Sequence, residues 1–119
     1  MYRPHKIGDT GEKIAAHHLV KKGYHILEYN WRSGKAEIDL IAHQNGTLVF
    51  VEVKTRSNTK FGYPESAVSE QKINMVYKGA TAYCRLVSHE SEIRFDIISI
   101  VLNPKLEILH FEDAFFPGW

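Results

Sequence analysis

The sequence predicts an α/β protein, and three observations support this fold class. Two apolar, β-branched runs flank Asn45-Gly46 and indicate a β-hairpin over residues 37–54. Apolar residues recur with helical spacing on both sides of this hairpin, over residues 7–22 and 69–86. Further strand-like runs precede and follow these segments, so the predicted order is helix, strand, hairpin, helix, strand, strand.

Length and composition are those of one globular domain spanning residues 1–119. Of the 119 residues, 44% are hydrophobic and 24% are charged, and the formal net charge is +1. No apolar run reaches the roughly eighteen residues of a membrane span, and the first residues lack the apolar core of a signal peptide. We therefore expect a cytoplasmic protein with no membrane partner. Because the net charge is close to zero, nucleic-acid binding would need a local basic patch.

The predicted first helix, over residues 7–22, carries an apolar stripe, and its start has two interpretations. Asp9 could cap the helix with Glu12 three residues later, so that Glu12 only returns a hydrogen bond to the backbone. Alternatively, the helix begins near Pro4. Glu12 then shares the apolar face and points toward the sheet.

Residues 24–31 form the next predicted strand, and a loop connects it to the hairpin. Trp31, at the end of the strand, is interpreted as core packing rather than base stacking, because aromatic residues there usually fill core volume. Arg32 and Lys35, in the loop, are candidates for phosphate contacts.

The hairpin turn determines which side chains of its two strands are expected to face each other. Asn45 and Gly46 tolerate the positive φ angles of a two-residue type I′ turn. A regular register outward from this turn places Asp39 opposite Glu52 and Glu37 opposite Lys54. Three acids and a lysine would then share one face at one end of an apolar sheet.

Such a cluster requires compensation, because facing acids repel and a partly buried carboxylate costs several kcal/mol without a cation. One interpretation is a cross-strand ion pair between Glu37 and Lys54 on a solvated edge. The other is a metal site, since Mg²⁺ accepts one or two carboxylates. The metal site is favoured because the polar residues do not continue along the face.

Residues 55–64 are polar, basic and rich in helix and strand breakers, which predicts a mobile loop that could gate a substrate. The predicted helix over residues 69–86 has Ser69 as its N-cap. Lys72 lies in its first turn, where backbone N–H groups suit an anion such as phosphate, although Lys72 could equally be a solvated surface lysine.

Two further strands are predicted at residues 92–101 and 106–111, on either side of a turn at Asn103-Pro104. The tail over residues 115–119 is too apolar to remain exposed. We expect it to fold back on the core or to meet a second subunit.

Asp39 is followed after twelve residues by Glu52-x-Lys54, and the helical Glu12 precedes both. This pattern resembles the PD-(D/E)XK nuclease superfamily, which includes restriction endonucleases and archaeal Holliday-junction resolvases, although Ile38 stands where the motif has its proline. From residue 11 to residue 115 the chain is more similar still to the bacterial YraN-like family. The segments that carry this likeness are Gly11-Glu12, Gly23-Tyr24, Asn30-Trp31-Arg32, Glu37-Ile38-Asp39-Leu40-Ile41, Phe50-Val51-Glu52-Val53-Lys54, Phe61-Gly62, Lys72 and Arg94-Phe95-Asp96.

The superfamily resemblance implies a restriction-endonuclease-like three-layer fold, with a mixed sheet of core order αβββαβ and a further C-terminal strand. It implies a metal-dependent endonuclease that hydrolyses phosphodiester bonds in DNA, including branched or processed DNA, with Mg²⁺ or Mn²⁺ as cofactor. Asp39, Glu52 and the carbonyl of Val53 would bind the metal, Lys54 would orient a water molecule, and Glu12 would complete the metal shell.

The role of Glu37 stays open between neutralising Lys54 and joining the metal shell. The expected partner is DNA. The side chains expected to follow its phosphate backbone without reading bases are Arg32, Arg56, Lys60 and Lys72.

A homodimer is expected, because the chain is small for gripping duplex DNA and its tail is apolar. The alternative function is a non-catalytic nucleic-acid-binding or scaffold module that retains the fold. The joint presence of Asp39, Glu52 and Lys54 favours the enzyme.

Overall fold

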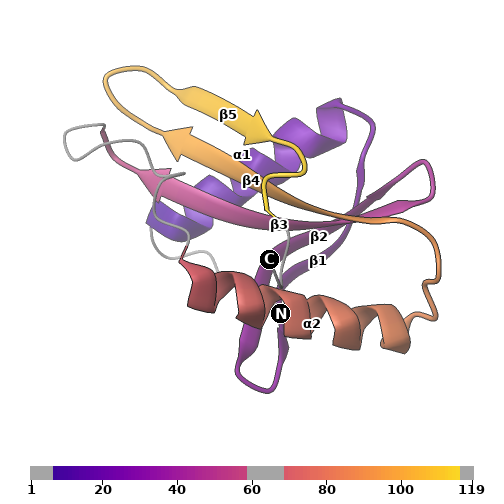
Figure 1. Cartoon of the computed structure of the whole chain (residues 1–119). Coiled ribbons are helices and arrows are strands. Elements are labelled where there is room, and N and C mark those ends of the chain that lie inside the picture. The colour runs from indigo at the N-terminus through magenta and orange to yellow at the C-terminus, as the bar shows by residue number, and fades with distance from the viewer. Residues whose placement is uncertain (1–6, 59–68, 116–119) are drawn as a thin grey trace.

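The computed structural model describes residues 7–58 and 69–115, which form an α/β fold with three layers. A five-stranded sheet in the order β1-β2-β3-β4-β5 separates two helices (Figure 1). The elements are α1 (Ile7–Lys21), β1 (His25–Ser33), β2 (Ala36–Gln44), β3 (Thr47–Arg56), α2 (Glu70–Leu86), β4 (Ile93–Val101) and β5 (Glu107–Phe111). The predicted fold class and element order are confirmed.

The sheet is mixed, because two antiparallel parts, β1-β2-β3 and β4-β5, are joined by one parallel pair of strands. Strands β1, β2 and β3 pair antiparallel in chain order, and β5 pairs antiparallel with β4. Strand β4 pairs parallel with β3, since the chain crosses over through α2 before it returns to the sheet. Neither described helix is long and apolar enough to cross a membrane.

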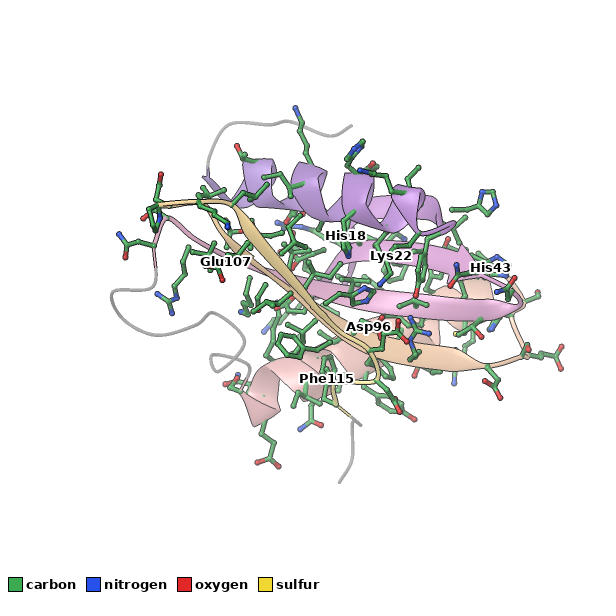
Figure 2. All side chains as sticks on the ribbon, turned by 90° about the horizontal axis from the view of Figure 1, so that it is seen from above. His18, Lys22, His43, Asp96, Glu107 and Phe115 are labelled. Carbon is green, nitrogen blue, oxygen red and sulfur yellow. The ribbon has the colours of Figure 1, made fainter. Side chains whose placement is uncertain are left out.

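Each face of the sheet buries its own apolar cluster under one helix, and Figure 2 shows the helices on opposite faces. The cluster under α1 consists of Ala15, Ala16, Leu19, Tyr24, Leu40, Ala42, Val49, Val51, Ile98 and Ile100. The cluster under α2 consists of Ile38, Ile41, Leu48, Phe50, Val76, Ala80, Tyr83, Phe95, Ile97 and Phe115. Both faces are therefore apolar near the hairpin turn, which is why strand β3 has a nearly continuous apolar sequence.

The predicted register of the hairpin is correct near the turn and wrong further out. Asn45 and Gly46 have φ angles of 50° and 84°, and the pairing runs from Gln44 opposite Thr47 to Leu40 opposite Val51. It does not continue to place Asp39 opposite Glu52 or Glu37 opposite Lys54.

The reason is an irregularity at Asp39. Ile38 packs under α2 while Leu40 packs under α1, although residues two apart in a regular strand share a face. The neighbouring strand is irregular at the same level: Asn30 has a φ angle of 48°, and the residues on either side of it pair with Leu40 and Ile38. Asp39 therefore lies where the side-chain alternation of β2 changes face.

The N-termini of α1 and α2 test the two candidate helix caps that the sequence contains, at Asp9 and at Ser69. The helix α1 already includes Ile7 and continues through Asp9, so Asp9 is not an N-cap and the capping-box interpretation of Glu12 is wrong. Ser69 is the N-cap of α2, and its side-chain oxygen accepts a hydrogen bond from the Lys72 N–H at 3.1 Å. Lys60, Phe61-Gly62 and the residues after Phe115 lie outside the described residues.

Asp96 of β4 is a fully buried carboxylate that the sequence did not predict. It lies on the α1 face of the sheet and connects β4 to His110 of β5. Asp96 is 0% exposed and accepts hydrogen bonds from the Arg94 guanidinium at 2.9 and 2.8 Å. His110 Nε2 lies 2.7 Å from Asp96 Oδ2, and the Asp113 N–H donates to Oδ1 at 3.0 Å. Burial alone would raise the pKa of Asp96, but the bonds from His110, Arg94 and Asp113 outweigh it and hold the pKa below its ordinary value.

Asp96→Asn should lower the free energy of unfolding by about 3 kcal/mol at neutral pH, since it leaves buried cationic donors without their carboxylate. Because the folded-state pKa of Asp96 is lowered, its stabilisation is present above the ordinary aspartate pKa and is lost as the pH falls through the folded-state value. Urea unfolding of both proteins between neutral pH and pH about 3 measures the difference.

Asp113→Asn is the matched control. Its side chain is exposed and only its backbone N–H reaches Asp96, so it should change stability by less than about 0.5 kcal/mol. A loss in Asp96→Asn that does not shrink at low pH would contradict the role given to the carboxylate.

Candidate functional site

The predicted acids and lysine gather at one rim of the sheet, where four elements supply them. Asp39 lies at the irregular position of β2, and Glu52 and Lys54 lie in the second half of β3. Glu12 comes from the second turn of α1. Lys72 comes from the first turn of α2. The rim therefore receives charged groups from both helical layers.

Asp39 is held against β3 by a backbone contact: the Val53 N–H donates to Asp39 Oδ2 at 2.8 Å. Burial is the largest cause that raises the pKa of Asp39 well above its ordinary value. A hydrogen bond with Glu52, the charge of Glu52 and the charge of Glu12 raise this pKa further, against the opposing effect of the Val53 N–H. The three carboxyl groups are thus close enough to repel one another.

Glu52 is the most buried member of this group, with 4% of its surface exposed. Its Oε2 atom forms ion pairs with two lysines, at 3.5 Å from Lys54 Nζ and 3.3 Å from Lys72 Nζ. Its Oε1 atom is buried without a hydrogen-bond partner among the described residues. A buried carboxylate oxygen in this state is costly unless a donor or a cation reaches it.

Glu37 pairs with Arg32 and not with Lys54. It lies opposite Arg32 in the β1–β2 register, and Arg32 Nη2 is 3.4 Å from Glu37 Oε2. The interpretation of Glu37 and Lys54 as a cross-strand ion pair, which was the less favoured alternative to a metal site, is therefore wrong. It depended on the hairpin register, which stops before these residues, so Lys54 is left to pair with Glu52.

A cavity of about 290 Å³ lies beside the acids, between the β1–β2 turn and the start of α2. Its lining residues are Lys35, Glu37, Ser69, Gln71, Lys72 and Met75. Lys72 therefore borders the cavity and contacts Glu52 at the same time. The cavity combines two lysines with the N-terminus of a 17-residue helix.

Gly11 allows α1 to approach β3 closely enough to bring Glu12 to the rim. A Cβ atom at this position would overlap the Thr55 side chain, starting with Oγ1. Any larger residue would force either the helix or the Thr55 side chain to move. The Gly11-Glu12 pair noted in the sequence thus has a geometric explanation.

The predicted nucleic-acid contacts are dispersed. Arg32 is exposed and paired with Glu37, and Arg56 lies partly buried at the end of β3. Lys72 reaches the acids, and Lys60 is outside the described residues. Trp31 packs edge-on against Tyr83 with ring centroids 5.1 Å apart, which confirms core packing as its role.

The donor set fits a hard divalent cation in part. Among the described residues, no group of three or more His, Cys, Asp and Glu side chains could hold a metal ion. Mg²⁺, however, needs only one or two carboxylates and completes its shell with carbonyls, waters and substrate oxygens. Asp39 and Glu52 supply carboxylates for such a smaller set, and Glu52 Oε1 has no hydrogen-bond partner among the described residues.

Sequence reasoning did not find the contact between Lys72 and Glu52. The two residues are far apart in the chain and belong to different layers, so no local pattern connects them. The only signal was the position of Lys72 in the first turn of a helix, which pointed to an anion in general.

The fold and the site define a three-layer α/β protein that holds three acids and two lysines at the rim of its sheet. The chain belongs to Uncharacterised protein family UPF0102, whose profile matches residues 11–100. It is 42% identical to a UPF0102 protein of Phocaeicola vulgatus over 98% of each chain. A UPF0102 protein of Flavobacterium psychrophilum is 47% identical over 92% of this chain and 93% of its own length. The expected likeness to the YraN-like family is thereby confirmed.

Asp39→Asn should stabilise the metal-free protein, raising its free energy of unfolding by on the order of 1 kcal/mol at pH 7. An amide carries no negative charge beside Glu52 and Glu12, and it can donate a hydrogen bond to Glu52 in place of the repulsion. Thermal or urea unfolding in the presence of EDTA measures this change.

Glu37→Gln makes the same chemical change at the neighbouring acid of β2. Because Glu37 pairs with the largely exposed Arg32, its replacement should alter stability by less than about 0.5 kcal/mol. An Asp39→Asn protein less stable than the unchanged chain would argue against crowding of the three acids.

Proposed function

We propose that this protein is a cytoplasmic, divalent-metal-dependent endonuclease that hydrolyses phosphodiester bonds in DNA. The observation that carries the proposal is the convergence of Asp39, Glu52 and Glu12 from three elements on one partly buried site. Repulsion among these acids costs stability, so the arrangement has to be explained by something the acids bind. The spacing of Asp39, Glu52 and Lys54 supports the same conclusion through its resemblance to PD-(D/E)XK nucleases.

Asp39, Glu52 and the Val53 carbonyl would hold Mg²⁺ or Mn²⁺, with Glu12 close enough to add charge or to hold a bound water. When bound, the cation supplies Lewis-acid chemistry and lowers the pKa of water so that it can attack phosphorus. The Val53 N–H keeps Asp39 oriented for this role, since it already fixes Oδ2 at 2.8 Å.

The two lysines would act on the phosphate. The Nζ atoms of Lys54 and Lys72 lie 3.5 and 3.3 Å from the same oxygen of Glu52. Both lysine side chains contact the acids and remain partly exposed to solvent. Each ammonium has three donors, and one contact to Glu52 leaves donors for a phosphate oxygen or the attacking water. Lys54 would orient the water, and Lys72 would neutralise charge that develops on the phosphate.

The cavity beside the acids would accept a neighbouring phosphate group. Lys35 and Lys72 border it, and the first turn of α2 presents backbone N–H groups there. Contacts of this kind position a nucleic-acid backbone without reading its bases.

The second candidate is a non-catalytic nucleic-acid-binding or scaffold module, and one observation favours it. Glu52 already has two lysine partners, so its charge is balanced without a metal ion. A protein that used the rim only to bind phosphate could keep these pairs permanently. Cleavage and binding assays on the same variants distinguish the two candidates.

Purified protein should nick or cut branched or single-stranded DNA in Mg²⁺ or Mn²⁺ but not in EDTA. Asp39→Ala and Lys54→Ala should each lower the cleavage rate by about 100-fold or more, because they remove a metal ligand and a group that acts on the water. A gel assay on labelled substrates measures the rates, and circular dichroism verifies that the variants are folded.

Lys78→Ala is the control, because Lys78 is an exposed lysine on α2 that contacts none of the acids; it should cleave at the unchanged rate. Absence of cleavage across a broad panel of DNA substrates, or equal rates in all variants, would contradict the nuclease assignment. DNA binding without any cleavage would favour the non-catalytic module.

We also propose that the protein forms a twofold homodimer. Strand β5 lies at an edge of the sheet and exposes Leu109 and Phe111 by 36% and 37%. Light scattering at high protein concentration should give twice the mass of the chain. A monomer under these conditions would rule the dimer out.

A further inference from the structure

A groove of about 430 Å³ lies between α1 and β5, outside the acidic rim. Ile14 of α1, Ile108 of β5 and Leu106, just before β5, supply apolar surface. The remaining lining residues all come from α1 and are basic or aromatic: Lys13, His17, His18 and Lys21. The groove therefore combines an apolar floor with a positively charged border.

The border has a regular spacing along α1. Lys13, His17 and Lys21 are four residues apart and all exposed, so they form one row along the helix surface. Four residues of an α-helix rise about 6 Å, which is close to the distance between successive phosphates of an extended nucleic-acid strand. A row of this kind can contact two or three phosphates in succession.

His18 also lines the groove, and its ring packs edge-on against His110 with the centroids 5.8 Å apart. Its Nε2 atom is buried and makes no hydrogen bond within the described residues. Burial, followed by the charges of Lys22, His110 and Lys21, lowers the pKa of His18 and so favours the uncharged ring. The imidazole beside Ile14 and Ile108 adds flat ring surface to the groove, on which a base can pack.

One end of the groove is nearer to the acids than the other end. Lys13 directly follows Glu12, whose charge acts on Asp39, and the row then runs along α1 away from the rim. A strand that lay along the row would have one end directed toward the acidic site.

We propose that the groove between α1 and β5 binds single-stranded DNA and leads it to the acidic rim, a role that rests on the nuclease function proposed above. Charge complementarity favours a polyanion, and the apolar floor favours one with exposed flat bases. Duplex DNA presents phosphates but keeps its base faces stacked inside, so the floor would stay uncovered. An unpaired strand covers both parts of the groove.

The probe is a fluorescein-labelled oligothymidylate of about ten nucleotides, a length suited to single-strand sites of this size. Fluorescence anisotropy in EDTA measures its binding without cleavage, with a duplex of equal length for comparison. The test variants are the double replacement Lys13→Ala/Lys21→Ala and Leu106→Glu, which places a carboxylate in the floor at a residue that is 49% exposed. Lys78→Ala/Arg85→Ala removes the same charge from exposed positions of α2, on the opposite face of the sheet.

The unchanged protein should prefer the single strand over the duplex. Lys13→Ala/Lys21→Ala should weaken binding by about ten-fold and reduce the slope of log K against log salt by about 1.4, or 0.7 for each lost phosphate contact. Leu106→Glu should also weaken binding, and the α2 control should keep the affinity of the unchanged chain. NMR signals of the Ile14 and Ile108 methyl groups should shift when the oligonucleotide is added.

Unchanged affinity and salt slope in Lys13→Ala/Lys21→Ala would overturn the proposal. Equal binding of duplex and single strand, or groove binding by poly-glutamate but not by the oligonucleotide, would overturn it as well. If cleavage requires Asp39 but is unchanged in the groove variants, the nuclease function is supported and the role of the groove is overturned. Groove-dependent binding without any cleavage would support the groove and count against the nuclease.

Discussion

Burial of the Glu52 carboxylate is the constraint on which the organisation of the rim depends. At 4% exposure the charge needs cationic partners, and they come from Lys54 on the same strand and Lys72 on α2. The same rim also takes Asp39 and Glu12, which increases the repulsion. The irregular position in β2 and the close approach of α1 at Gly11 both serve to bring these acids together.

The molecule contains two buried carboxylates whose surroundings have opposite effects. Asp96 is surrounded by Arg94, His110 and the Asp113 N–H, which lower its pKa and connect β4 to β5 and the segment that follows. Asp39 has one backbone donor and two neighbouring acids, and its pKa is raised. The first arrangement stabilises the fold. The second costs stability, as is typical of sites that bind a ligand or a cation.

The hairpin shows how far a sequence pattern predicts this structure. Asn45-Gly46 predicted the turn and the register as far as Leu40 opposite Val51, because turn geometry and alternation act between neighbouring residues. The predicted register is wrong at Asp39. The two residues that flank it, Ile38 and Leu40, point to opposite faces of the sheet and pack under different helices. The sequence nevertheless predicted that Asp39, Glu52 and Lys54 lie close together. That prediction assumed that Asp39 faces Glu52 across the hairpin, and the strands do not pair in this way there.

The sequence by itself determined the element order, the hairpin turn, the helix cap at Ser69 and the candidate acids of the site, since each depends on residues close together in the chain. Only the tertiary structure decided that Lys72 contacts Glu52, that Glu37 pairs with Arg32 and that Asp96 meets His110. These contacts join separate strands and helices, and their geometry depends on how the layers pack. Local propensity carries no information about such packing.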